Sequence, residues 1–191
     1  MKTLYNLMQK KEYQIPNDIL LIFKDIIEKG EAKNEPSLDH ECTNEFFQAM
    51  EDHLTAEQRC RIFEKYGGCM GAGQDKARKT FASEHILMPL EAKVELFAKK
   101  FNRNVVLNKD NTISVIFTCS HGYFRRARES KNPPPLPPIQ SYFERCAGGR
   151  LYELQKALGI KLKIKSIDIS SLKENLDNPV VYTFDIINKF E

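Results

Sequence analysis

The sequence predicts an α+β protein with a helical N-terminal half packed on a mostly antiparallel sheet that one helix crosses. Three observations predict it. Apolar residues recur at helical spacing as far as Phe97, and beyond Asn104 the spacing becomes that of strands. A hairpin signal then joins the first two strands. Because helices come first and strands later, without alternating, the order of elements favours α+β over a parallel sheet.

The first predicted helix begins at Asn17, whose side chain can cap it, and ends at Gly30. The polar stretch 31–40, which contains Pro36, is expected to be a loop. A second helix follows, and its apolar face is formed by Phe46, Phe47, Met50 and Leu54.

Thr55 and Gln58 have the spacing of a capping box and predict the start of a third helix, which Gly67 ends. The glycine-rich segment 67–73 contains Cys69 but lacks the Gly-Lys-Ser/Thr ending of a phosphate-binding loop, so it gives no reason to expect nucleotide binding. It is interpreted either as a turn or as a loop that lets the backbone approach a ligand.

A fourth helix is predicted at 74–82, and a fifth begins at Pro89. Two strands follow at 104–107 and 112–117, joined by the hairpin signal at 108–111. The proline-rich stretch 120–138 is interpreted as a rigid connector, with an exposed polyproline II ligand as the alternative.

The stretch 140–158 predicts a helix that is broken, or starts, near Gly148 and Gly149 and is capped by Gly159. Two strands close the chain, at 161–169 with a slip in the alternation near Ser166, and at 180–186. The whole chain, 1–191, is predicted to be one domain, with a helical N-terminal extension at 1–58 and a core at 60–187.

The composition is that of an ordinary globular protein: of 191 residues, 29% are charged and 41% hydrophobic. The net charge of +3 is too small, and the basic cluster at Arg125, Arg126 and Arg128 too short, to predict a nucleic-acid partner. No apolar run has the length of a transmembrane helix and the N-terminus lacks the apolar core of a signal peptide, so a cytoplasmic protein without a membrane partner is expected.

Cysteine usage argues against a disulfide framework and against a zinc ribbon, because the five cysteines are an odd number and form no CxxC pair. Cys119 and His121 directly follow a predicted strand, and Cys146 precedes the paired glycines of the last helix. Thiol and imidazole groups at strand ends and in loops are where ligand contacts usually lie.

Three interpretations of these residues stay open. Cys119, His121 and Cys146 could bind zinc or iron, with Cys69 or Asp168 as a further ligand. A cysteine beside a histidine could act as a nucleophile. Alternatively, the free cysteines pack as small hydrophobic side chains.

Arg150 and Tyr123 are further candidates for ligand contact. Arg150 could hold a ligand carboxylate, or it could pair with Glu144 or Glu153. Tyr123 follows His121 and could line a pocket wall, or it could be an ordinary core aromatic residue.

Five segments of the chain form a pattern of their own: 66–71, 117–121, 146–154, 158–164 and 180–186. On this pattern, the chain resembles the C-terminal half of vinyl-4-reductase-type domains and their relatives, over roughly residues 60–187. The relatives include aminothiazoline-carboxylate hydrolase-like proteins and a set of uncharacterised Cys-containing bacterial and archaeal proteins, which are the nearest in pattern.

The resemblance implies a domain whose helix and sheet enclose a small-molecule pocket. In the relatives such pockets serve the sensing of aromatic or hydrocarbon ligands, or the processing of tetrapyrroles. In zinc-binding relatives, the positions of Cys146 and Asp168 correspond to ligands. The final hairpin, 170–181, has no cysteine where these relatives have two, so the resemblance does not carry over a complete zinc site, which needs about four ligands.

The sequence therefore predicts a small-molecule-binding protein with a Cys/His-lined pocket, in which zinc or iron could assist. The predicted ligand-binding residues are Cys69, Cys119, His121, Tyr123, Cys146 and Arg150, and the predicted metal ligands among them are Cys119, His121 and Cys146. A Cys-dependent hydrolase or redox enzyme is one alternative. A module that forms a homodimer through the sheet or the proline-rich segment is the other.

Overall fold

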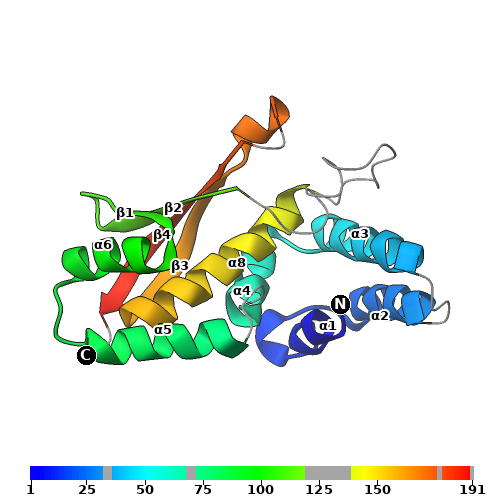
Figure 1. Cartoon of the computed structure of the whole chain (residues 1–191). Helices are drawn as coiled ribbons and strands as arrows, with labels where there is room; N and C mark the ends of the chain where they lie inside the picture. The colour runs from blue at the N-terminus through cyan, green and yellow to red at the C-terminus, as the bar shows by residue number, and fades with distance from the viewer. Residues whose placement is uncertain (32–35, 68–71, 119–138, 176–177, 190–191) are drawn as a thin grey trace. The chain divides into compact units, whose positions relative to one another are not determined.

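The computed structural model describes residues 1–31, 36–67, 72–118, 139–175 and 178–189 and confirms the α+β class (Figure 1). The chain divides into two units, which are described separately. Unit 1 comprises Met1–Tyr66 and His121–Arg145, and unit 2 comprises Gly67–Ser120 and Cys146–Glu191. The prediction of a single domain is not tested by this division and stays a prediction.

Unit 1 is built from helices around one apolar core. Its elements are α1 (Lys2–Met8), the 3-10 turn η1 (Lys11–Tyr13), α2 (Asn17–Glu31), α3 (Pro36–His53), α4 (Ala56–Tyr66) and the first residues of α8 (Ile139–Leu158). The predicted apolar stripes of α2 and α3 are confirmed, because Phe23, Phe46 and Met50 are completely buried. The rings of Phe23 and Phe46 are 4.9 Å apart between centroids, a favourable tilted contact.

The predicted capping box of α4 is also confirmed. The backbone N–H of Gln58 donates to Thr55 Oγ1 at 3.2 Å, and the backbone N–H of Thr55 donates to Gln58 Oε1 at 3.0 Å. The predicted loop at 31–40 is wrong in its second half, because α3 already begins at Pro36. Proline fits the first helical position, where its missing N–H would have had no helical partner.

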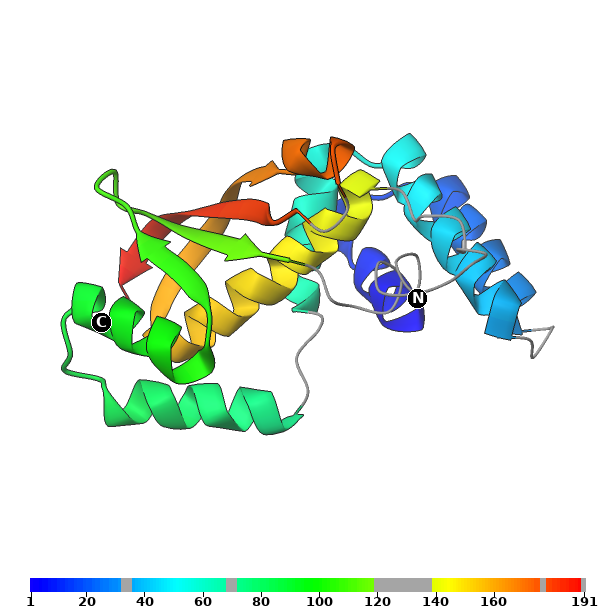
Figure 2. The same cartoon turned by 45° about the horizontal axis from the view of Figure 1, so that its top comes forward.

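Unit 2 is a four-stranded sheet with helices. The strands are β1 (Asn104–Leu107), β2 (Thr112–Phe117), β3 (Ile160–Asp168) and β4 (Val180–Lys189), in the order β1-β2-β4-β3. All pairings are antiparallel, as predicted. The helices are α5 (Ala72–Glu84), α6 (Leu90–Phe101) and the larger part of α8, with the 3-10 turn η2 (Ser170–Lys173) between the last two strands. Figures 1 and 2 show α6 and this part of α8 on one side of the sheet.

Strand alternation explains which face of the sheet is covered. Val105, Val115 and Tyr182 form one cross-strand row and are buried, whereas the next row along, Val106, Ser114 and Thr183, is at least partly exposed. The predicted slip near Ser166 is confirmed as a register shift between Ile164 and Ser166.

The prediction that the last helix breaks or starts at Gly148 and Gly149 is wrong, because α8 runs without interruption through both glycines. Both are buried. Their low helix propensity is a local preference of about 1 kcal/mol each, and burial of the surrounding helix overrides it. The predicted end of α8 is confirmed: Gly159 follows it with φ +67°, a left-handed conformation that favours glycine.

Gly67, which ends α4 as predicted, has φ +58° and lies against Tyr152 of α8. A Cβ atom at Gly67 would lie 2.8 Å from Tyr152 Cδ2. We expect Gly67→Ala to lower the free energy of unfolding by about 2 kcal/mol, from backbone strain and overpacking together. Urea unfolding measures this. Gly73→Ala is the matched control, because no described atom beyond its chain neighbours and its own helix backbone lies within 4 Å of its Cβ position. Equal stability of the two variants would contradict the expectation.

Candidate anion-binding site

Of the residues predicted to contact a ligand, two lie in the described part of the chain. Cys69, Cys119, His121 and Tyr123 lie outside the described residues. Cys146 and Arg150 are both buried on α8, one helical turn apart and therefore on the same face.

Arg150 forms an ion pair with Glu153, one of the two partners, Glu144 and Glu153, that the sequence suggested. Its Nη1 donates to Glu153 Oε2 at 2.6 Å. Glu144, the other choice, pairs with Arg59 instead. The guanidinium of Arg150 also lies over the ring of Phe117, the last residue of β2, at 4.9 Å from the ring centroid.

Two more arginines meet the same carboxylate. Arg78 of α5 donates to Glu153 Oε1 through Nε at 3.1 Å and through Nη2, and Arg103, just before β1, donates to the same oxygen through Nε at 3.3 Å. The guanidinium of Arg78 stacks on Phe101 of α6 at 3.7 Å from the centroid. We call Arg78, Arg103, Arg150 and Glu153 the arginine cluster.

The arginine cluster is mostly shielded from water. The side chains of Glu153, Arg78 and Arg150 are 3%, 6% and 9% exposed, and that of Arg103 is 26% exposed. In the described part of the chain, Glu153 is the only carboxylate within ion-pair distance of these guanidiniums. The cluster therefore holds two positive charges in excess, with Arg103 as its solvent-facing member.

The electrostatics of the arginine cluster act on Glu153. Burial raises the pKa of this carboxyl group, but the charge of Arg150, the hydrogen bond from Arg78 and the charge of Arg103 together outweigh it, and the pKa of Glu153 lies below its ordinary value. Glu153 therefore stays ionised at neutral pH and cannot serve there as a proton donor.

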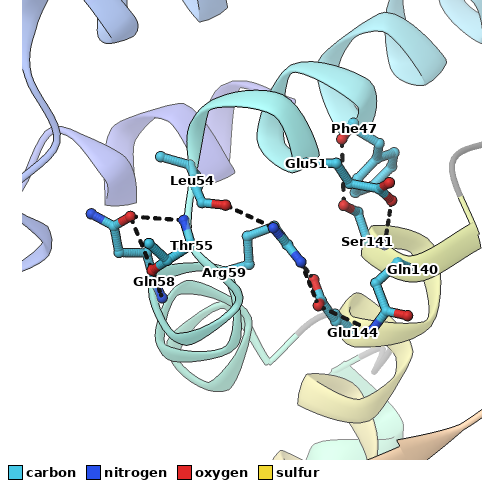
Figure 3. A network of polar contacts seen from close by, with 9 residues as sticks. All are labelled: Phe47, Glu51, Leu54, Thr55, Gln58, Arg59, Gln140, Ser141 and Glu144. Atoms are coloured by element: carbon cyan, nitrogen blue, oxygen red, sulfur yellow. Dashed lines mark hydrogen bonds and ion pairs between the residues drawn. The ribbon is translucent and has the colours of Figure 1, made fainter.

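A buried arginine in unit 1 shows the contrasting case of balanced charge (Figure 3). Arg59 of α4 binds Glu144 of α8 with two hydrogen bonds, Nε to Oε2 at 2.7 Å and Nη2 to Oε1 at 3.0 Å. Its Nη1 donates to the carbonyl of Leu54 at 2.7 Å, just beyond the C-terminal end of α3. This pair uses both carboxylate oxygens for a single guanidinium and leaves no excess charge, so a structural role explains it fully.

The contacts at the start of α8 extend this network (Figure 3). The backbone N–H of Ser141 donates to Glu51 of α3 at 2.8 Å, so an acidic side chain caps the N-terminal end of α8. Ser141 Oγ donates to the carbonyl of Phe47 at 3.4 Å. These bonds hold the first residues of α8 against α3 within unit 1.

Sequence reasoning missed Arg78 and Arg103. The sequence does contain an indication of Arg78, because Arg78 lies three residues before Phe81 and therefore on the same face of α5. Both residues are buried. A charged residue on such a face needs a buried partner. Arg103 lies in the short link between α6 and β1, and nothing in the sequence distinguishes it from a surface arginine.

Asp168, considered from sequence as a further metal ligand, is exposed at the end of β3. Its carboxylate accepts hydrogen bonds from Ser170, from the backbone N–H at 2.9 Å and the hydroxyl at 2.6 Å. These bonds lower the pKa of Asp168 and start the turn η2. Within the described ranges, no three His, Cys, Asp or Glu side chains are grouped closely enough to hold a metal ion.

Comparison with known proteins gives no relative. No protein-family model, curated protein or solved structure matches this chain. The resemblance to vinyl-4-reductase-type domains thus stays a prediction. Among the helices that the structure describes, none has the length and apolar character required to cross a membrane.

Proposed function

We propose that this protein binds a small molecule through an anionic group, a carboxylate or a phosphate, at the arginine cluster of unit 2. The observation that carries the proposal is the charge imbalance: three guanidiniums converge on one buried carboxylate. A second anion would balance this charge, and a partly desolvated site strengthens the attraction.

The hydrogen-bonding capacity of the cluster also supports an anionic ligand. Each guanidinium carries about five N–H donors in a planar fork, which suits carboxylate and phosphate oxygens. Four N–H groups of the three arginines donate to Glu153. Further donors of Arg103, the most exposed member, can face a ligand that arrives from solvent.

The stacked rings hold two of the arginines in place before a ligand binds. Phe101 and Phe117 cover Arg78 and Arg150, respectively, and fix the planes of their guanidiniums. Preorganised arginines lose less side-chain entropy when an anion binds. Cys146 lies on the same helix, one turn before Arg150. Of the three cysteines predicted to contact a ligand, it is the one within the described residues.

Isothermal titration calorimetry with pyrophosphate and with citrate tests the proposal. We expect saturable one-site binding of at least one of these anions. Arg103→Gln should weaken it by about tenfold or more, because a charge-assisted hydrogen bond is lost. Arg103 is the choice for substitution because its exposure makes it the least disruptive member of the cluster.

Lys99→Gln is the matched control for charge. Lys99 is an exposed residue of α6, so its substitution removes one positive charge from unit 2 without touching the cluster. Binding should be unchanged in this variant. Two results would overturn the proposal. One is equal weakening of binding by Lys99→Gln and Arg103→Gln, and the other is that neither pyrophosphate nor citrate binds at millimolar concentration.

A further inference from the structure

Unit 1 contains a groove between α2 and α3, which lie side by side in Figures 1 and 2. Its volume is about 450 Å³. The lining residues recur at helical spacing on both helices: Ile22, Asp25, Ile26 and Lys29 on α2, and Glu45, Gln48, Ala49, Asp52 and His53 on α3. The groove therefore follows both helices for about two turns, roughly 10 Å.

The floor of the groove is apolar. Ile26 and Ala49 are buried there and Ile22 is half-buried. Two neighbouring helices with an apolar floor between them form the surface on which a third amphipathic helix packs in helix-in-groove recognition. Shape and polarity thus favour a helical occupant over a compact polar molecule.

The rim of the groove is negative, although the chain as a whole carries a net charge of +3. Glu45 is neutralised by Lys29, whose Nζ lies 2.7 Å from its carboxylate. Among the described residues, Asp25 has no ion pair, and Asp52 accepts only a neutral hydrogen bond, from Gln48 at 2.9 Å. Among the residues that line the groove, one unbalanced carboxylate therefore lies on each helix, on either side of the apolar floor.

We propose that this groove docks a basic amphipathic helix of a partner protein. An apolar side chain of that helix would cover Ile26 and Ala49, and lysine or arginine residues flanking it would meet Asp25 and Asp52. The net positive charge of this chain disfavours a second copy of itself as the occupant. The proposal rests on unit 1 alone and does not depend on the arginine cluster.

Fluorescence anisotropy tests it with a labelled, helix-forming peptide of leucine and lysine, about 15 residues long, and with a matched peptide of leucine and glutamate. We expect the basic peptide to bind with one-to-one stoichiometry, more weakly as salt is added, and the acidic peptide not to bind. Asp25→Asn should weaken binding about two- to fivefold, the usual effect of an exposed ion pair. Amide chemical shifts that change on binding should map to α2 and α3.

Glu28→Gln is the control variant, because Glu28 lies on α2 but outside the groove lining. It should leave the affinity unchanged. Equal binding of both peptides, equal effects of Asp25→Asn and Glu28→Gln, or shift changes away from α2 and α3 would overturn the proposal. So would a homodimer that Asp25→Asn dissociates, since a second copy would then be the occupant.

Discussion

Replacing Glu144 with glutamine will lower the free energy of unfolding by about 3–5 kcal/mol, because the guanidinium of Arg59 is then buried without a counter-charge. Both side chains are almost fully buried, and the pair is held by two hydrogen bonds. The hydrogen bond from Gln140 to Glu144, at 3.2 Å, is perturbed as well. Urea unfolding followed by circular dichroism gives the change directly.

Two controls separate this effect from a general loss of surface charge. Glu28→Gln breaks an exposed ion pair with Lys24 in the same unit and should change stability by less than about 1 kcal/mol. The double variant Arg59→Met with Glu144→Leu should be more stable than Glu144→Gln, because it removes both buried charges together. A Glu144→Gln protein as stable as Glu28→Gln would show that the buried pair contributes little.

Replacing Glu153 with glutamine will destabilise unit 2 by at least about 3–5 kcal/mol, because the three guanidiniums then repel one another with no carboxylate between them. The same variant should become more stable when an anion such as pyrophosphate is added, if the anion replaces the lost charge. Thermal unfolding with and without pyrophosphate measures both effects. A Glu153→Gln protein with wild-type stability would contradict the expectation.

The pH dependence of stability follows from the same carboxylate. The pKa of Glu153 in the folded protein is lower than the ordinary value of about 4.5. Its stabilising contribution is therefore complete above about pH 4.5 and is lost as the pH falls toward the lower, folded pKa. The wild-type free energy of unfolding should fall over this acidic range more steeply than that of Glu153→Gln. Parallel profiles would argue against the arginine cluster as the cause.

Local patterns accounted for the elements that the sequence predicted well. The capping box of Thr55 and Gln58 involves residues three apart, and the hairpin of β1 and β2 is signalled by the turn residues between them. The errors arose where the surrounding structure overrides a local preference. Gly148 and Gly149 remain helical because they are buried within α8, and no feature of their own sequence neighbourhood reveals that burial.

The candidate site was predictable only where its residues are neighbours in the chain. Arg150 and Glu153 are three residues apart on one helix, so their pairing could be anticipated from spacing alone. Arg78 and Arg103 lie 75 and 50 residues from Glu153 in the sequence. The folding of α5 and of the link before β1 onto α8 brings them to the carboxylate, and no short motif encodes that.

The two-segment composition of unit 1 has a consequence for its synthesis. Arg59 leaves the ribosome 85 residues ahead of Glu144. At about 5–20 residues per second, roughly 4–17 s pass before its carboxylate is made. Meanwhile α3 and α4 lack the residues 139–145 that complete unit 1, and the intervening segment Gly67–Ser120 of unit 2 emerges first. During this interval, the N-terminal helices of the nascent chain therefore contain Arg59 without the carboxylate of Glu144, and unit 1 can be completed only after that later segment has been synthesised.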